Sequence, residues 1–527
     1  MNAIISILPI VLLFVLMLGF KVQSWLSALI TFVATAALAL WGAPAMGIIP
    51  GQLAGESVAS VVWWATAEGI LKAVFPILLI ILMAIYSYNI LVASKAIEVI
   101  KDRFTSFTDD KGVLVLMMVW GFGGLLEGMA GFGTAVAIPA AILIGLGFKP
   151  MFSALVALLG NTVATGFGAV GVPVTTLCNE ITPGGVASAQ TVCEVSTFAV
   201  LQLAPLFLLI PFVILTLTDR KAWLRNIILS VWVGGVSLGV QLLCSTFLGA
   251  ETPAIVGSIA AIAAIIIYAR VFVPKKKDSA PRRYYTWGET FRAWSVYIFI
   301  LVLILATGAL CPPVNGFLKS NLLTQLPLPV IGSTFKFGWI SNAALWLFVG
   351  SVAGGLTQGL GWRQLVNVLA STIVNLRFTA ITIISLIALA SVMNYSGMIG
   401  AIAAGLVAVS GSFYPLFAPL IGAIGTFVTG SDTSSNILFG KLQANVAHQL
   451  GMTGQGSYLG FSGSQSDWLA AANTTGATGG KMISPQSIAI ATAACDMKGA
   501  DDTILRRAIP YALVYILLGG LMVYFSV

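Results

Sequence analysis

Two stretches far apart in the chain decide the fold: residues 161–173, NTVATGFGAVGVP, and residues 473–485, NTTGATGGKMISP. Aligned without gaps, they share Asn-Thr at the start, a glycine at the eighth position and the final proline. Both lie among apolar residues, yet both contain too much Gly, Thr and Pro for an ordinary membrane helix. In a bilayer, unwound backbone is tolerated only where it is buried in protein or lines a wet cavity. Two such breaks at corresponding places in two halves predict the substrate site of a secondary transporter.

The composition indicates a polytopic membrane protein. Of the 527 residues, 58% are hydrophobic and 8% are charged, whereas soluble domains carry about 25% charged residues. The net charge of +8 comes from Lys and Arg in short loops between apolar runs, as the positive-inside rule describes, so we expect no nucleic-acid partner. The sequence has one His and no Gly-rich phosphate loop. We therefore expect no metal site, no ATP hydrolysis and no cofactor.

Apolar segments of about 20 residues, the length that crosses a bilayer, predict about twelve crossings. Placing the basic loops in the cytoplasm puts both termini outside it. The candidate spans are 3–20, 25–41, 70–93, 151–170, 196–217, 222–247, 253–273, 294–310, 339–356, 378–395, 467–480 and 507–525.

Two further apolar stretches, 113–148 and 415–450, predict hairpins that enter the membrane and return on the same side. Each has an apolar arm, a tip rich in small residues that starts at Gly123 or Gly425, and a second arm. A second glycine follows five residues later in both tips. Glycine allows the close approach and unusual backbone angles that a re-entrant tip needs.

The predicted fold class is an all-α polytopic membrane protein with an inverted structural repeat, two re-entrant hairpins and two broken helices. The segment 96–109 is charged and amphipathic, which suits the cytoplasmic interface. Its counterpart 398–413 is nearly uncharged, and the sequence leaves open whether it crosses the membrane. The predicted division is 1–69 for N-terminal scaffold helices, 70–217 for repeat 1 (hairpin 113–148, broken helix 151–173), 218–377 for scaffold helices with a basic cytoplasmic loop at 274–292, and 378–527 for repeat 2 (hairpin 415–450, broken helix 467–485).

Lys481 is the first candidate for substrate binding. It follows Gly479-Gly480 in a stretch where charge is scarce, and a lysine at membrane depth costs about 2.5–3.5 kcal/mol on insertion scales. A substrate carboxylate would compensate that charge, aided by the positive end of a half-helix at 484–494. A snorkelling lysine or a fixed structural ion pair is the alternative.

Glu127 and Asp432 lie at the two hairpin tips and are candidates for proton coupling. An intramembrane carboxylate is by default a functional-site hypothesis, with proton relay among its usual roles. For Asp432 the alternative is a helix cap, because Thr433-Ser434-Ser435 follows it.

Neutral polar residues and small residues complete the predicted substrate site. Amides and hydroxyls suit a hydroxyl-bearing substrate, although each would equally serve as a hydrogen bond between neighbouring helices. The predicted set is Asn161, Thr162, Asn473, Thr474, Ser431, Ser434, Gly131, Phe132, Gly480 and Ser484.

Two weaker patterns remain. Gly460-Phe461-Ser462-Gly463 is similar to the GxSG motif of intramembrane serine proteases, but it lies in a polar loop and His448 precedes Ser462, opposite to the order in that family. Cys178 and Cys193 fall in one polar loop that we expect outside the cytoplasm, where a disulfide and two free thiols are both open.

Two longer motifs resemble the lactate permease family: residues 472–489 around ANTTG and GKMISPQSIA, and residues 128–135, GMAGFGTA. The resemblance extends over nearly the whole chain. It implies uptake of lactate, and of glycolate as a related monocarboxylate, by proton symport across the bacterial inner membrane. It also implies an elevator-like motion of the hairpin domain against a scaffold, in a carrier that contacts membrane lipid. A sodium-coupled carboxylate carrier with Asp432 holding the ion is the alternative, and a homodimer is left open.

Overall fold

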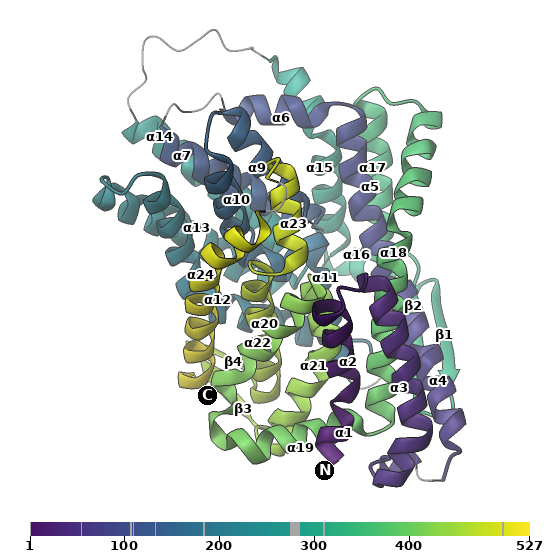
Figure 1. Ribbon diagram of the computed structural model, residues 1–527. Helices are drawn as coiled ribbons and strands as arrows, with labels where there is room; N and C mark the ends of the chain where they lie inside the picture. The colour runs from purple at the N-terminus through teal and green to yellow at the C-terminus, as the bar shows by residue number, and fades with distance from the viewer. Residues whose placement is uncertain are drawn as a thin grey trace.

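The computed structural model describes residues 2–526 except 54, 106–107, 109, 132, 183–184, 274–284, 309–310 and 498–499. The described chain is helical almost throughout, with two short β-hairpins (Figure 1). Among the described residues, ten helices are long and apolar enough to cross a membrane, or eleven if one bent pair counts as a span. Two of the predicted spans, near 3–20 and 339–356, contain only shorter apolar helices.

One side of the molecule is a group of long helices that we call the scaffold group. In it, α18 packs against α3, α4 and α5, while α17 packs against α5 and α15, on the right in Figure 1. Its helices are α3 (Ser24–Met46), α4 (Val58–Lys72), α5 (Leu79–Ala93), α15 (Trp287–Thr307), α17 (Ala343–Thr357) and α18 (Trp362–Tyr395). Shorter elements accompany them: α1 (Asn2–Ser6), α2 (Leu8–Phe14), η1 (Val15–Gly19), η2 (Gly51–Leu53), η3 (Ala73–Leu78), α6 (Ala96–Thr105), α16 (Pro312–Ser320) and the antiparallel strands β1 (Leu323–Leu328) and β2 (Ser333–Gly338).

The remaining elements form the hairpin group. The first hairpin consists of α7 (Lys111–Leu116), η4 (Met117–Phe122), α8 (Gly123–Met129) and α9 (Thr134–Gly145), and the second of α20 (Tyr414–Thr429) and α21 (Asp432–Gln449). The broken helices are α10 (Pro150–Gly160), η5 (Val163–Phe167) and α11 (Gly168–Ile181) in one half, and α22 (Gln465–Lys481) and α23 (Pro485–Ala494) in the other. Around them lie α12 (Ala189–Thr218), α13 (Trp223–Leu248), α14 (Pro253–Phe272), α19 (Met398–Ser410), η6 (Gly411–Phe413), β3 (Gln455–Tyr458), β4 (Phe461–Ser464) and α24 (Asp501–Phe525).

Each of the two stretches predicted as hairpins folds as helices joined by a turn, and the two lie in opposite halves of the molecule. In Figure 1, α7 to α9 occupy the upper half and α20 with α21 the lower half, while α6 and α19 lie across opposite ends. The segment 398–413, left open by the sequence, is α19 with η6 at the lower end. Both turns, around Gly131 and Gly133 and at Gly430-Ser431, lie inside the predicted tips, whereas Gly128 and Gly425 lie inside helices and pack closely there.

The first predicted break is confirmed. Helix α10 ends at Gly160, and the chain passes through η5 into α11 with a bend of 49°. Ala169 and Val170 have φ of 44° and 60°, in the left-handed region that residues with a side chain rarely adopt. Such strained backbone is typical of functional sites.

The second predicted break is displaced. Helix α22 runs without interruption through Gly476 and Gly480, and the chain leaves the helix only between Lys481 and Pro485. A methyl group on Gly476 would lie 1.6 Å from the carbonyl oxygen of Pro419, and one on Gly480 would lie 2.2 Å from that of Ala423. These glycines therefore let α20 and α22 pack backbone to backbone, as small residues do between membrane helices, and they do not unwind α22.

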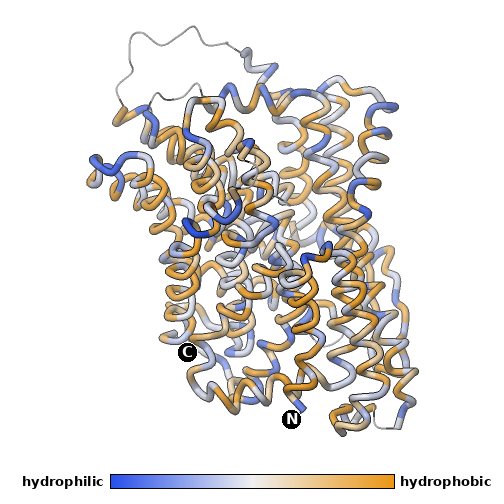
Figure 2. Tube along the Cα trace, viewed as in Figure 1, coloured by the Kyte–Doolittle hydropathy of each residue, from blue (hydrophilic) through white to orange (hydrophobic). Residues whose placement is uncertain are grey.

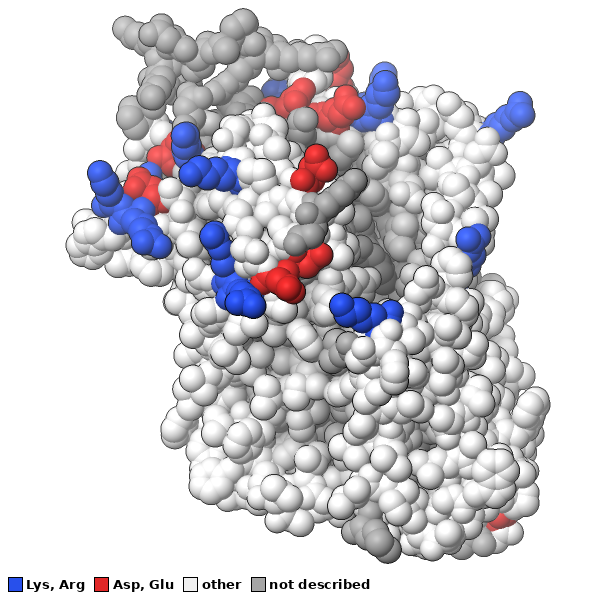
Figure 3. All heavy atoms as spheres, viewed as in Figure 1, with Lys and Arg blue, Asp and Glu red and all other residues white. Residues whose placement is uncertain are grey.

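Polar groups are distributed unevenly along the molecule. Apolar residues cover most of the lower half (Figure 2), and on the face shown in Figure 3 the charged side chains gather in the upper half. The side chain of Asp110 caps α7 by accepting from the Val113 N–H at 2.9 Å, and it pairs with Arg225 of α13 at 2.7 Å.

Cys178 and Cys193, predicted in a polar loop, lie in α11 and α12, and both are free.

Candidate functional site

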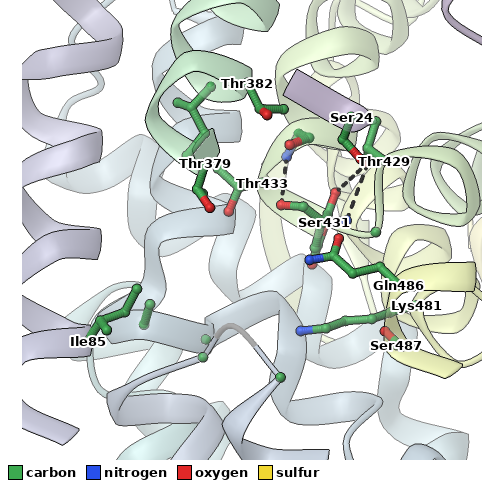
Figure 4. Close-up of a pocket in the computed structure, with 18 of the residues that line it drawn as sticks. Ser24, Ile85, Thr379, Thr382, Thr429, Ser431, Thr433, Lys481, Gln486 and Ser487 are labelled. Atoms are coloured by element: carbon green, nitrogen blue, oxygen red, sulfur yellow. Dashed lines mark hydrogen bonds between the residues drawn. The ribbon is translucent and has the colours of Figure 1, made fainter. Parts of the chain in front are cut away.

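A cavity of about 650 Å³ lies between the tips of the two hairpins and the scaffold group. The hairpin group contributes both tips, the end of α22 and the start of α23; the scaffold group contributes α18 and the start of α3. Figure 4 shows Lys481, Gln486 and Ser487 on one side of this cavity and Thr379 and Thr382 on another. The cavity thus lies where the two groups of helices meet.

The strongest interaction at the cavity wall is an ion pair between the two halves of the hairpin group. Lys481 Nζ, at the last residue of α22, lies 2.7 Å from Glu127 Oε1 of α8. Lys481 is 9% exposed and Glu127 is 2% exposed. Among the described residues, Glu127 Oε2 has no hydrogen-bond partner. One carboxylate oxygen of Glu127 is therefore neutralised, and the other is left unsatisfied.

Three helices begin at the cavity wall, and each presents its positive end to it. Gly131 and Gly133 before α9, Thr433 and Ser434 of α21, and Gln486 and Ser487 of α23 all line the cavity. Ser431 caps α21 by accepting from the Ser434 N–H, and Ser484 caps α23 by accepting from the Ser487 N–H. Helix N-termini and a lysine together make a site that favours an anion.

Asp432, the first residue of α21, is a second carboxylate at the same wall. It is 2% exposed, and neither of its oxygens has a hydrogen-bond partner among the described residues. Thr474 lies nearby; its hydroxyl accepts a hydrogen bond from Asn436, and its O–H remains able to donate to Asp432. A buried carboxyl without partners is costly, which sets Asp432 apart from the other polar groups of this wall.

The structure separates the predicted substrate residues into two sets. Gly131, Ser431 and Ser434 line the cavity together with Lys481, whereas Phe132 lies outside the described residues. The others are buried behind the cavity wall: Asn161, Thr162, Asn473, Thr474, Gly480 and Ser484.

Within this second set, Asn473 and Thr474 belong to a network of buried side chains. Asn473 donates to Asn436 at 2.9 Å and accepts from Gln443 at 3.2 Å. Asn161, by contrast, has no partner for either side-chain polar atom among the described residues.

Sequence reasoning missed the scaffold side of the cavity. Thr372, Asn375, Thr379 and Thr382 recur every three or four residues along α18 and line the cavity with Ser24 of α3. This spacing places them on one face of the helix. The signal was available as a polar stripe at helical period within a long apolar segment.

The alternative protease site is not assembled. Ser462 lies in the small hairpin of β3 and β4, and His448 lies near the end of α21. Both are exposed, and neither lines the cavity. Among the described residues, no group of three or more His, Cys, Asp or Glu side chains is arranged to hold a metal ion.

Comparisons with known proteins identify the family. The sequence matches the family described as L-lactate permease over residues 2–527. It is 36% identical to an L-lactate permease of Streptococcus iniae, over 86% of this chain and 92% of that protein. It is 30% identical to the glycolate permease GlcA of Escherichia coli, over 98% of this chain and 94% of that protein.

Among solved structures, the YdaH transporter of Alcanivorax borkumensis is similar with a TM-score of 0.53 at 13% identity, covering 94% of this chain and 98% of that chain. That likeness concerns the fold alone. The predicted resemblance and the all-α polytopic class are thus confirmed, the inverted repeat stays a prediction, and the protein is a multi-pass membrane protein. The chain belongs to the L-lactate permease family.

Proposed function

We propose that this protein takes up lactate, and glycolate as a related 2-hydroxy monocarboxylate, by proton symport across the bacterial inner membrane. The family and the names of the relatives support the substrate class. The observation that carries the proposal is the 2.7 Å pair of Lys481 and Glu127 at the wall of a cavity where three helices begin.

The cavity suits a small hydroxy acid. Lys481 and the N–H groups at the starts of α21 and α23 would bind the carboxylate, because both supply positive charge. Ser431 and Ser434 would bind the hydroxyl, and Ile490 would contact the methyl group. At about 650 Å³ the cavity holds such an anion together with water, since water takes about 30 Å³ per molecule in the liquid.

Proton coupling follows from competition for Lys481. In the empty site the lysine is neutralised by Glu127, so a substrate carboxylate has to displace that partner. A proton on Glu127 removes its charge and releases Lys481 for the substrate. The loaded site then has one ammonium paired with one carboxylate, as the empty site has, and one proton accompanies one anion.

Asp432 offers the competing hypothesis. Its two unpartnered oxygens and the backbone carbonyls of the hairpin turn would equally suit a sodium ion, for which oxygen ligands are required. In the proton hypothesis Asp432 is a second group able to carry the coupled proton.

The orientation and the motion are proposed from the charge distribution. The exposed wall residues Gln23, Ser24 and Asn375 mark the mouth of the cavity, and exposed Lys21 lies beside it. If the Lys-rich and Arg-rich end is cytoplasmic, the cavity is open to the inside and both termini lie outside. Transport then requires the hairpin group to move against the scaffold group, as an elevator does.

Proton flux in liposomes tests the proposed function. An inward lactate gradient across liposomes that contain the purified protein should acidify the lumen, as reported by an internal pH dye. Glycolate should give the same result. No acidification with either anion would overturn the proposal. Loss of lactate flux when choline replaces sodium would favour the sodium hypothesis.

A further inference from the structure

Four charged residues outside the cavity meet where the scaffold and hairpin groups touch. Glu68 and Lys72 lie on α4 of the scaffold group. Glu180 lies on α11 and Lys441 on α21, both in the hairpin group. None of the four lines the cavity, and the proposed transport reaction uses none of them. Such a cluster in a chain with only 8% charged residues calls for a role.

The scaffold half of the cluster is firmly held. Glu68 is 1% exposed and accepts hydrogen bonds from Ser333 of β2 at 2.8 Å, from Ser391 of α18 at 2.9 Å and from Tyr395 of α18 at 3.1 Å. Lys72 lies 3.3 Å from the same carboxylate. Four partners fix Glu68 as a charged group at this contact.

The hairpin half reaches across to it. Lys441 Nζ lies 6.0 Å from the ring centre of Tyr395, the residue that also donates to Glu68. Glu180 is attracted by the positive charges of Lys72 and Lys441 and repelled by Glu68, while Lys441 is repelled by Lys72 and attracted by Glu180 and Glu68. The attraction between Glu180 and Lys72, which line one pocket, is therefore the charge interaction that joins the two groups across the contact.

The cluster borders a second, smaller pocket. Lys72 and Glu180 line this pocket of about 150 Å³ together with Thr176 of α11. Pro173, one helical turn before Thr176, lines the large cavity instead. Along α21, Lys441 lies nine residues beyond Asp432, which is about 13.5 Å at the rise of an α-helix. The small pocket thus lies beyond the substrate site, away from the mouth at Gln23.

We propose that Glu68, Lys72, Glu180 and Lys441 form the outer gate of the carrier, and that the small pocket is the closed outer entrance. This inference rests on the proposed function, because it assumes that the hairpin group moves. While the cavity is open on the basic side, the attraction between Glu180 and Lys72 holds the two groups together. When the hairpin group moves, Glu180 and Lys441 leave Glu68 and Lys72, and the pocket widens.

The distribution of charge makes such a gate reversible. An unpaired buried charge is strongly destabilising, so a gate with one sign on each side would be costly to open. Here each group carries one acid and one base: Glu68 with Lys72, and Glu180 with Lys441. Each half therefore remains neutral after separation, and opening exposes two internally compensated halves.

Accessibility of a single cysteine tests the gate. The full chain, with its five native cysteines replaced and Thr176→Cys introduced, is expressed in cells whose outer face is treated with a membrane-impermeant maleimide. In the parent protein the buried Cys at 176 should react slowly. Glu180→Gln with Lys441→Gln should raise the labelling rate roughly tenfold, within the usual 5- to 150-fold range of coupling between sites.

A second variant and a matched control complete the test. Glu180→Lys turns the attraction between residue 180 and Lys72 across the contact into repulsion, so labelling should rise further. Glu56→Gln with Lys319→Gln removes one exposed charge of each sign elsewhere and should leave the rate unchanged. Parental labelling rates in both gate variants, or an equal rise in the control, would overturn the gate.

The labelling readout requires no transported anion. The gate can therefore fail while lactate flux in liposomes persists, which would leave the proposed function intact. Conversely, labelling that responds to the gate variants in a protein without lactate flux would overturn the proposed substrate alone.

Discussion

Replacement of Glu127 by Gln tests the proposed coupling most directly, because Gln has the shape of the protonated acid without the charge. In the wild type, lactate has to displace Glu127 from Lys481, a contact of 2.7 Å between two buried groups. In Glu127→Gln this competition is weakened at every pH. We therefore expect downhill exchange of lactate to survive and uphill accumulation driven by a pH gradient to be lost.

The magnitude follows from the contact. A hydrogen bond to a charged group contributes roughly 1.5–3 kcal/mol, which is about ten- to hundredfold in a dissociation constant. Because the Gln amide still accepts a weaker hydrogen bond from Lys481, we expect lactate to bind up to about tenfold more tightly to the variant. If one proton is bound together with each lactate, the affinity of the wild type for lactate falls about tenfold for each pH unit, at pH values where the empty carrier has lost that proton. In the variant, affinity should be independent of pH.

Two assays on the same protein separate the outcomes. Counterflow of labelled lactate in liposomes measures exchange, and accumulation under an imposed pH gradient measures coupling. Uphill accumulation by Glu127→Gln would refute the role of Glu127. Asp432→Asn is the matched variant at the same cavity, and it should keep the pH-driven accumulation. If Asp432→Asn instead lost this accumulation while Glu127→Gln kept it, the coupled proton would be assigned to Asp432.

Further variants address the substrate and the packing. Lys481→Ala should weaken lactate binding by about ten- to hundredfold, measured by equilibrium binding to the purified protein; wild-type affinity would assign Lys481 to structure. Gly476→Val should lower the free energy of unfolding in detergent by at least about 1–3 kcal/mol, because even a methyl group would lie 1.6 Å from the Pro419 carbonyl oxygen. Gly235→Val is the control, since nothing lies within 4 Å of a methyl group there; equal losses in the two would contradict the packing argument.

The sequence predicted the hairpins and the first broken helix because charge and helix-breaking residues are rare in this chain. A run of Gly, Thr and Pro among apolar residues has few uses in a membrane, and at 161–173 it does unwind the helix. The same composition failed at 476–480, where the glycines serve close packing against α20. Glycine permits both unusual backbone angles and close approach, and the sequence alone does not distinguish them.

The charged residues of the site were predictable, whereas of the neutral ones only Gly131, Ser431 and Ser434 line the cavity. Glu127, Asp432 and Lys481 all line the cavity. They were predictable because a charge at membrane depth is costly and is rarely kept unless it has a partner or a function. Asn473 and Thr474 instead satisfy other buried side chains. Hydroxyls and amides in membrane helices are inexpensive and often bond within the protein, so their presence near a break carried little information.

The two walls of the cavity differ in a way that fits a moving hairpin group. Every charged residue that lines it, Glu127, Asp432 and Lys481, belongs to the hairpin group, while α18 and α3 contribute hydroxyls, amides and apolar side chains. A fixed charge on the scaffold wall would hold an anion in place and oppose its displacement, because Coulomb attraction in a region of low dielectric is strong and long-ranged. Neutral groups such as Thr379 and Thr382 can instead exchange hydrogen bonds with water as the substrate passes. The charge that binds the anion would thus travel with it, and the surface that it passes would remain electrically neutral.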